Sequence, residues 1–312
     1  MPHTLLEDVG AACPTVLTVG VFDGVHLGHR TVIQRVVAAA RRLGARSCVI
    51  TFEPHPQTVL AASSIPLLST TGEKSALLMS EGIDIVVVVP FDLDLSNLSA
   101  RDFISDILIH KIGLIHLIIG YDHALGKGAS GNASVIVQIG KEFDFTLEII
   151  EPQADGGRAY SSSQIREILA RDGNVADAKV RLGRMYELTG KVVHGDGRGK
   201  GLGFPTANLE LDHTRKLVPA NGVYAVTVTR EANGSQYDGI MNIGVRPTLT
   251  SGMQRVLEAH LLEFDDDLYD EMLTIHFVDR IRDERKFDGV EELTSQIQYD
   301  LADCIRLLAS LS

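Results

Sequence analysis

Two histidines, His26 and His29, lie where a predicted strand ends and a predicted helix begins. They belong to the glycine-rich stretch Gly20–His29, which follows the apolar run Thr15–Val19 and precedes Arg30–Leu43, a segment with helical periodicity. Glycines let a backbone approach a ligand closely, and a helix N-terminus offers free N–H groups and partial positive charge to phosphate. Histidines there can donate to phosphate oxygens and stabilise charge as a phosphoanhydride bond breaks. The alternative is a turn with two exposed histidines. The predicted nucleotide-binding residues of this stretch are Gly20, Phe22, Asp23, Gly24, His26 and His29.

A second glycine-rich segment, His194–Asn208, has the parts for a different phosphate site. It contains five glycines, with Arg198 and Lys200 between them, and ends in a rigid Pro205 followed by polar residues. Its glycine N–H groups can bind phosphates, and hydroxyl and amide oxygens are hard ligands that suit Mg²⁺. The Gly-Lys-Ser/Thr ending of a P-loop is missing. A structural hairpin is the alternative. We predict nucleotide binding by Gly201, Gly203, Thr206 and Asn208, and metal binding by Thr206 and Asn208.

Three weaker patterns could complete these sites. The segment Ser161–Arg166 starts a predicted helix, where a serine can cap the end and Arg166 can reach a phosphate; an ordinary cap with a surface arginine is the alternative. The segment Gly120–Asn132 has four glycines in its first twelve residues and suits either a ligand-wrapping loop or a surface loop. His55, between two prolines, could contact a nucleotide or finish a turn.

A possible base lies in the second half of the chain. Glu258 and His260 share one face of a predicted strand because side chains alternate along a strand. A carboxylate on a strand inside a small barrel can deprotonate a hydroxyl group, although most strand carboxylates face solvent.

The elements that must position these residues fall into two groups. The first half alternates strands with helices, which predicts a parallel sheet covered by helices, with ligands beyond the carboxyl ends of its strands. Its predicted strands are 15–19, 47–52, 83–89, 115–119 and 145–150, and its helices are 30–43, 73–80, 100–111 and 163–170. After about residue 183, short alternating runs and glycine-rich turns predict a small antiparallel barrel or sandwich. Those runs are 186–193, 222–229, 239–243, 255–263 and 273–277, and a last helix covers 290–308.

Composition narrows the classes of function. A chain of 312 residues is long for one core, so two domains are expected, and we place them at 1–183 and 184–312. The net charge of −12 argues against a broad basic surface for nucleic acid. The cysteines Cys13, Cys48 and Cys304 show neither metal-ligand nor disulfide spacing, which favours a reducing cytoplasm. The N-terminus lacks a signal-peptide pattern, and no apolar run approaches the ~20 residues of a membrane span.

Taken in order, these motifs resemble the bacterial bifunctional riboflavin kinase/FAD synthetase family. The resemblance covers the chain from Thr15 to about Leu301. The segments that carry it are 20–29, 51–56, 120–131, 161–166, 203–208, 221–224, 242–248, 258–260, 264–269 and 282–287. It implies a Rossmann-like nucleotidyltransferase domain that transfers AMP from ATP to FMN, giving FAD and pyrophosphate. It also implies a small antiparallel β-barrel domain with a C-terminal helix, which phosphorylates riboflavin with ATP and Mg²⁺.

The resemblance also implies roles for individual residues. In the first domain, His26 and His29 hold ATP phosphates together with Ser162, Ser163 and Arg166, and Asp122 lies in a flavin-binding loop. In the second domain, Thr206 and Asn208 hold Mg²⁺ and phosphates, and Glu258 is the base. Arg282 and Glu284 are assigned with Glu258 to flavin binding. The predicted catalytic residues are therefore Glu258, His26, His29 and Arg166.

The expected partners are small molecules, namely ATP, riboflavin and FMN, with neither nucleic acid nor membrane; no sequence signal indicates an oligomeric state. His123 and Leu125 stand where the family has aromatic residues, which predicts weaker flavin stacking in the first domain. Two alternatives follow. One is a riboflavin kinase with a degenerate adenylyltransferase domain, and the other is a flavin-binding carrier or regulator without turnover.

Overall fold

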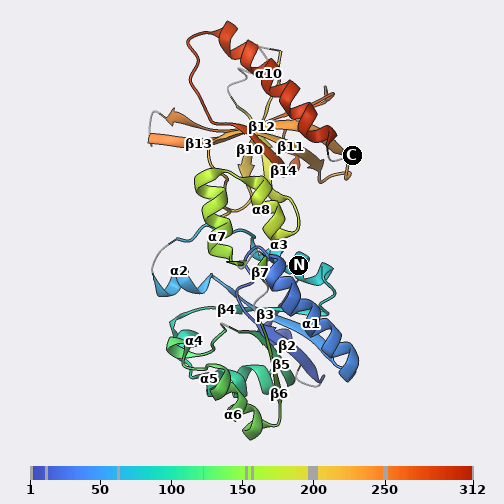
Figure 1. Ribbon diagram of the computed structural model, residues 1–312, viewed down its shortest axis with the longest axis vertical. Coiled ribbons are helices and arrows are strands. Elements are labelled where there is room, and N and C mark those ends of the chain that lie inside the picture. The colour runs from blue at the N-terminus through green and yellow to red at the C-terminus, as the bar shows by residue number, and fades with distance from the viewer. Residues whose placement is uncertain are drawn as a thin grey trace. The chain divides into compact units, whose positions relative to one another are not determined.

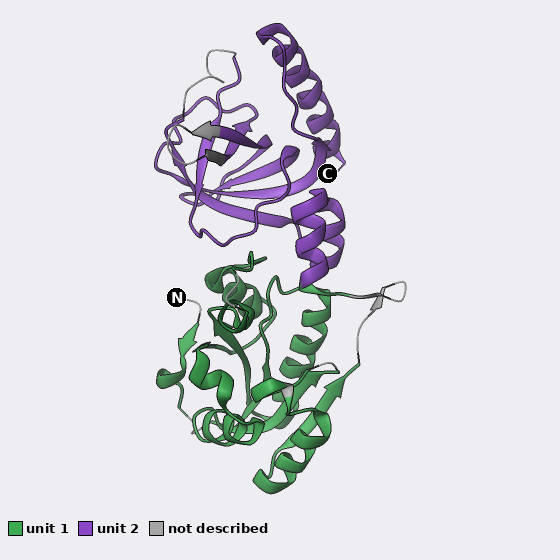
Figure 2. Cartoon of the chain, turned by 90° about the vertical axis from the view of Figure 1, so that its left-hand side faces the viewer, with its two compact units in different colours: residues 1–162 green, residues 163–312 purple. Residues whose placement is uncertain are grey.

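The computed structural model describes residues 3–10, 13–61, 64–121, 123–151, 154–155, 158–195, 203–248 and 252–310. The chain divides into two compact units, residues 1–162 and 163–312 (Figure 2). We describe each unit by itself.

The first unit is built on a parallel sheet of six strands in the order β1-β4-β3-β2-β5-β6 (Figure 1). The predicted alternation of strands and helices is confirmed, with a short additional strand at one edge. The strands are β1 (Thr4–Leu5), β2 (Thr15–Val19), β3 (Arg46–Glu53), β4 (Ile85–Pro90), β5 (Leu114–Gly120) and β6 (Thr146–Ile150). The helices are α1 (Leu27–Leu43), α2 (Pro56–Leu60), α3 (Thr71–Ser80), α4 (Leu93–Asn97), α5 (Ala100–Asp102) and α6 (Ala133–Phe143).

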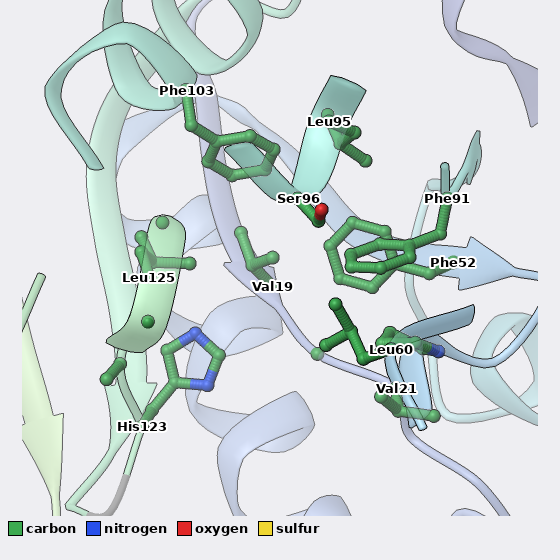
Figure 3. Close-up of a pocket in the computed structure, with 15 residues that line it drawn as sticks. Val19, Val21, Phe52, Leu60, Phe91, Leu95, Ser96, Phe103, His123 and Leu125 are labelled. Atoms are coloured by element: carbon green, nitrogen blue, oxygen red, sulfur yellow. The ribbon is translucent and has the colours of Figure 1, made fainter. Parts of the chain in front are cut away.

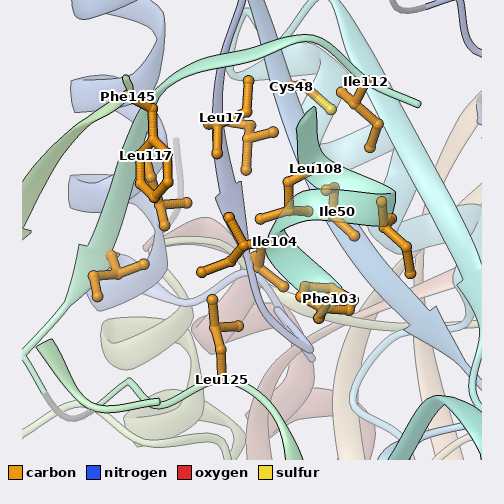
Figure 4. Packing of buried hydrophobic residues seen from close by; sticks show 14 of the residues in the cluster. Leu17, Cys48, Ile50, Phe103, Ile104, Leu108, Ile112, Leu117, Leu125 and Phe145 are labelled. Atoms are coloured by element: carbon orange, nitrogen blue, oxygen red, sulfur yellow. The ribbon is translucent and has the colours of Figure 1, made fainter. Parts of the chain in front are cut away.

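Both faces of this sheet are buried, because alternate residues of its strands enter two different hydrophobic clusters. Leu17 and Val19 of β2 belong to one cluster and Val16 to the other. Figure 4 shows the first cluster, in which Leu17, Cys48 and Ile50 face a π-helical segment, Phe103–Ile109, that continues α5. The second cluster packs beneath α1 and α3. This packing fixes the carboxyl ends of the strands, from which the predicted site loops leave.

The second unit is a closed antiparallel barrel of six strands in the order β10-β13-β12-β11-β14-β9. Its strands are β9 (Tyr186–Val193), β10 (Ala207–Leu211), β11 (Gly222–Arg230), β12 (Gln236–Thr248), β13 (Gly252–Leu261) and β14 (Met272–Arg282). Large rings fill the interior, where Tyr224 packs edge-on against Phe277 at 5.3 Å between centroids. The barrel is the first of the two predicted forms, and β10 is a strand that the sequence pattern did not indicate.

A long helix, α10 (Val290–Ala309), covers one side of the barrel. Its Cys304 and Leu308 form a cluster with Val223, Ala225 and Ile240, which alternate with the inward residues of β11 and β12. The helix therefore packs on the outer wall of the barrel.

The segment before the barrel holds α7 (Ser162–Glu167), a π-helical turn (Ile168–Asp172) and α8 (Val175–Leu182). Its Leu169 carbonyl accepts a hydrogen bond from the Ala220 N–H at 2.8 Å, and Gly173 leaves no room for a side chain beside Tyr224. We count the segment with the second unit from Ser163 onward; the domain limits 1–183 and 184–312 stay a prediction.

No helix in the described ranges is both long and apolar enough to cross a membrane.

Two candidate active sites

The histidine stretch forms the turn that leads into α1. The helix begins at Leu27, three residues earlier than predicted, because the His26 imidazole caps it: Nδ1 accepts from the His29 N–H at 3.3 Å. His29 therefore lies inside the first turn, and its ring stacks on that of His26 at 3.6 Å between centroids. The two imidazoles form one stacked pair at the helix start, where free N–H groups attract anions.

The backbone of this turn is strained, and buried contacts hold it in place. Phe22 and Val25 adopt positive φ angles of 51° and 41°, although both side chains are buried. For a β-branched residue such as Val25 this is a rare conformation, and strain of this kind gathers at functional sites. Gly20 is required because a Cβ there would lie 2.9 Å from the Phe22 ring.

Asp23 and Gly24 connect the turn to neighbouring loops. The buried Asp23 carboxylate accepts hydrogen bonds from the N–H groups of Leu68 and Ser69 at 3.1 and 3.0 Å. Gly24 N–H donates to Ser69 Oγ at 2.9 Å, and the Asp23 carbonyl accepts from Ser162 Oγ at the same distance. The carboxylate of Asp23 thus holds the loop, and its assignment to nucleotide binding stays a prediction.

Burial and nearby positive charge control the protonation of His29. Desolvation, followed by the charges of His26 and Lys74, holds the pKa of His29 well below its ordinary value. In the part of the chain that the structure describes, His29 Nδ1 is buried without a hydrogen-bond partner. A neutral imidazole still has one N–H to donate, so His29 keeps a donor for an anionic ligand near neutral pH.

A cavity of about 520 Å³ opens beside this turn. Figure 3 shows Phe52 and Phe91 on one side of it and His123 and Leu125 on the other, with Phe103 between. Gly20 and Val21 of the histidine turn, the stretch Gly20–His29, also line the cavity, so a ligand bound there lies against this turn. Its volume and its largely apolar lining are those of a small-molecule site.

The glycine-rich loop after β5 forms one wall of this cavity. A Cβ on Gly126, whose φ is +75°, would lie 2.3 Å from the Ala100 backbone nitrogen, so the loop packs directly on α5. Of the predicted loop residues, Asp122 lies outside the described residues. His55 caps α2 by accepting from the Gln57 N–H at 3.2 Å. Ser163 and Arg166 lie on α7, in the second unit, and their phosphate role stays a prediction.

A second cavity, of about 350 Å³, lies between the barrel wall and α10. Glu258, Thr206, Arg282 and Glu284, all predicted site residues, line it together. Leu293, Ile297 and Asp300 line it from the helix, and Phe204 and Phe287 add two aromatic rings. The sequence did not indicate that α10 lines this cavity, because the spacing of its apolar residues is that of any helix packed on one face.

The carboxylate of Glu258 is on the outer wall of the barrel, so its expected place inside the barrel was wrong. Glu258 pairs in register with Asn208 on β10 and with Asn242 on β12, and opposite residues share a face. Asn242 is on the same face of β12 as Ile240, which packs against α10. The interior is filled by large apolar side chains, which leaves only the outer wall for a polar site.

Two donors orient the Glu258 carboxylate. Arg246 Nη2 donates to Oε1 at 3.2 Å, and Asn242 Nδ2 approaches Oε2 at 3.5 Å. Arg246 was not predicted as a site residue. The two contacts hold the carboxylate in place on the outer wall of the barrel.

The glycine loop before β10 is only partly described. Residues 196–202, which include Gly201, lie outside the described residues. Gly203 has a φ of +84°, and Gly195 packs on Asn208, because a Cβ there would lie 2.1 Å from its side-chain nitrogen. No cluster of three or more His, Cys, Asp or Glu side chains suited to a metal occurs among the described residues.

Arg282 and Glu284 are held by neighbours at the rim of this cavity. Arg282 donates to both carboxylate oxygens of the buried Asp300 on α10, with Nη2 at 2.7 Å from Oδ2. Glu284 accepts from Asn221 Nδ2 at 3.0 Å and from the Val245 N–H at 3.2 Å. Arg282 therefore links β14 to α10, and Glu284 links the segment after β14 to Asn221 and to β12 at the rim of the cavity.

Sequence comparison assigns each region to a known family. A sequence profile of the family described as FAD synthetase matches residues 9–164, and one described as riboflavin kinase matches residues 182–308. The chain is 37% identical to the bifunctional riboflavin kinase/FMN adenylyltransferase of Pseudomonas fluorescens over 94% of this chain and 93% of that protein. It is 36% identical to the protein of the same name from Bacillus subtilis, over 99% and 97% of the two chains.

Structural comparison finds a solved structure that is similar over nearly the whole chain. A crystal structure described as a macrolide-efflux protein of Streptococcus pneumoniae matches with a TM-score of 0.87 and 29% identity, covering 97% of this chain and 98% of that one. The two family profiles match consecutive parts of the chain, and the two relatives are 36–37% identical over nearly their whole length. The chain therefore belongs to the bifunctional riboflavin kinase/FMN adenylyltransferase family.

Proposed function

We propose that the cavity of the first unit binds FMN beside ATP held by the histidine turn, and that the cavity of the second unit binds riboflavin. The enzyme is a riboflavin kinase and an FMN adenylyltransferase. The observation that carries the first assignment is that Gly20 and Val21 line the same cavity as three phenylalanine rings. An acceptor with a flat apolar ring and a terminal phosphate fits that arrangement.

In AMP transfer, an FMN phosphate oxygen attacks the α-phosphorus of ATP, and the bond to the pyrophosphate oxygen breaks. The attacking oxygen is already an anion, so the site needs no strong base. It must instead orient two negatively charged substrates and stabilise the leaving pyrophosphate. The imidazole N–H of His29 and the free backbone N–H groups at the start of α1 are donors that the first unit offers to the phosphates. Ser162, Ser163 and Arg166 complete this set in our proposal.

In riboflavin phosphorylation, the 5′-hydroxyl of riboflavin attacks the γ-phosphorus of ATP, and ADP leaves. A neutral alcohol benefits from a base, and Glu258 is the carboxylate that lines the cavity with Thr206. Glu258 takes the hydroxyl proton, while Arg246 and Asn242 hold its two oxygens in position. Phe204, Phe287, Leu293 and Ile297 supply the apolar surface for the isoalloxazine ring.

The donor set of the second cavity suits Mg²⁺ carried by a nucleotide. Mg²⁺ prefers one or two protein oxygens together with phosphate oxygens and water, rather than a cage of protein ligands. The Thr206 hydroxyl and the Asn208 amide oxygen are such ligands, and Asn208 is in register with Glu258 on the neighbouring strand. When bound, the ion would neutralise charge on the transferring phosphate.

The small-molecule partners and the cellular compartment are also part of this proposal. ATP, riboflavin and FMN are the small-molecule partners, and the cytoplasm is the compartment, in keeping with three cysteines that form no disulfide.

A pair of variants of the whole chain tests the assignment of the sites. Each is incubated with riboflavin, ATP and Mg²⁺, and the flavins are separated and quantified. Glu258→Gln is expected to lower FMN formation by about 10²- to 10⁴-fold while FMN supplied directly is still converted to FAD. His29→Ala is expected to do the reverse. Equal loss of both activities in either variant, with riboflavin supplied for one assay and FMN for the other, would contradict two separate sites.

The alternative of a kinase with a degenerate first domain rested on His123 and Leu125. Neither the comparisons nor the geometry supports it, because Phe52, Phe91 and Phe103 supply rings on other walls of the same cavity. A carrier without turnover is likewise unsupported.

A further inference from the structure

Lys74 is a buried lysine beneath the histidine turn, and none of the roles above uses it. It lies in the first turn of α3 and is only 4% exposed. Among the lysines and arginines of the first unit whose side chains the structure describes, it is the only buried one. Its ammonium group donates to the Val21 carbonyl oxygen at 3.1 Å, in the same turn that carries His26 and His29.

Two carboxylates face the ammonium group, and each is fixed from elsewhere. Asp23 accepts from the N–H groups of Leu68 and Ser69, and Glu53, at the end of β3, accepts from Thr71 Oγ1 at 2.7 Å. Both attract the charge of Lys74, but burial outweighs them and lowers the pKa of Lys74 to about 8. The ordinary pKa of lysine is 10.5, so burial brings the gain or loss of this proton into the range around pH 8.

The ammonium group is also coupled to the histidine pair. Its positive charge is one of the causes that lower the pKa of His29, after burial and His26. The ionisable groups coupled to Lys74 are therefore Asp23 from the turn, Glu53 from β3 and His29 from the first turn of α1. A negative ligand at that turn would act on the same set.

We propose that Lys74 is a positioning residue for AMP transfer, which ties the histidine turn to β3 and α3 and takes up a proton when a polyphosphate binds at the turn. The proposal rests on the function assigned to this turn above. Lys74 does not touch the substrate. It holds the Val21 carbonyl and keeps a positive charge under the turn once the triphosphate is bound.

The size of the proton uptake follows from the ionisation of Lys74. With a pKa of about 8, the side chain is half protonated at pH 8. If a polyphosphate raises that pKa by about one unit, the protonated fraction rises from about 0.5 to about 0.9. Binding then takes up about 0.4 proton per site at pH 8.

The test measures this proton directly. A non-hydrolysable ATP analogue with Mg²⁺ is titrated into the whole chain at pH 8 by calorimetry, in buffers of different ionisation enthalpy. Wild type, Lys74→Met, Lys74→Arg and the exposed control Lys141→Met are compared. The kinase site contributes equally to all four chains. Lys74→Met and Lys74→Arg are expected to take up about 0.4 proton less than wild type, because methionine and arginine do not titrate there.

Activity separates positioning from charge. Lys74→Met is expected to lower FAD formation from FMN by about 100-fold, a loss typical of misplaced reacting groups, while FMN formation is unchanged. Lys74→Arg keeps the charge and is expected to restore most of that loss. If Lys74→Met does not fold, Lys74→Arg still tests the proton uptake.

Proton uptake that is the same in wild type and in Lys74→Arg would overturn the proposal, and so would unchanged FAD formation in Lys74→Met. A wild-type chain that forms no FAD at all would instead refute the proposed function of the turn.

Discussion

The ion pair between Arg282 and Asp300 leads to a quantitative prediction about the stability of the second unit. The Asp300 side chain is 4% exposed and accepts three hydrogen bonds from Arg282, which is 20% exposed, and one from Gln296 at 2.7 Å. Removing one partner of a buried pair costs about 3–5 kcal/mol, because the other charge is left buried and unpaired. Partial exposure of Arg282 places Asp300→Asn at the lower end, at about 3 kcal/mol. That is a large part of the stability of a domain, which is about 5–15 kcal/mol.

Urea unfolding of the whole chain measures this loss. The chain has no tryptophan, so circular dichroism and tyrosine fluorescence report the transitions. Asp303→Asn is the matched control, since Asp303 lies on the same helix but pairs with the exposed Arg306. It is expected to change the free energy of unfolding by less than about 0.5 kcal/mol. Equal unfolding midpoints for Asp300→Asn and Asp303→Asn would refute the reasoning.

A double variant separates stability from flavin binding. Arg282→Met with Asp300→Leu replaces the pair by apolar side chains, which is often neutral or stabilising when a pair is buried. It is expected to regain most of the stability that Asp300→Asn loses. Its KM for riboflavin is expected to be higher than that of wild type, because the cavity has lost Arg282. Recovery of both properties would show that Arg282 serves only to hold α10.

Three further predictions concern the first unit. Gly126→Ala is expected to cost about 3 kcal/mol or more and to weaken FMN binding, because its Cβ would overlap the Ala100 backbone; Gly128→Ala, with a φ of +61° and open space around it, should cost only about 1–2 kcal/mol. Phe103→Ala, at a side chain that is 5% exposed, is expected to cost about 3–5 kcal/mol and to raise the KM for FMN but not for riboflavin, which steady-state assays would measure. Because the pKa of folded His29 lies below its ordinary value of 6.5, the unfolded chain binds the proton first as the pH falls. The first unit should therefore lose stability as the pH falls below about 6.5, and less so in His29→Gln, a difference that urea midpoints over that range would detect.

The sequence predicted the parallel sheet well because its strands are buried on both faces. A run such as Ile85–Val89 is apolar throughout, so no register or partner is needed to recognise it. Helices α6 and α8 escaped prediction although each begins at a capping asparagine, Asn132 and Asn174. Their caps fall in loops that read as turns, and a cap is visible only once the following turn is known to be helical.

Site residues that lie close together in one segment could be predicted from the sequence. Residues that only the fold brings together could not. His26 and His29 could be recognised from their spacing within one loop. Lys74 reads as a surface residue of α3, and only tertiary contact places it beneath the Val21 carbonyl. Phe91 and Phe103 likewise look like core residues, because their shared cavity joins segments distant in sequence.

The place of Glu258 outside the barrel has a consequence for redesign. The packed interior around Tyr224 and Phe277 is separate from the proposed flavin cavity, which lies between the outer wall and α10. The two apolar lining positions of α10 can therefore be varied while its Asp300 and its packed residues Cys304 and Leu308 are kept. Libraries confined to Leu293 and Ile297 would sample new ring shapes for the acceptor while leaving the interior and the Glu258 row of the wall untouched.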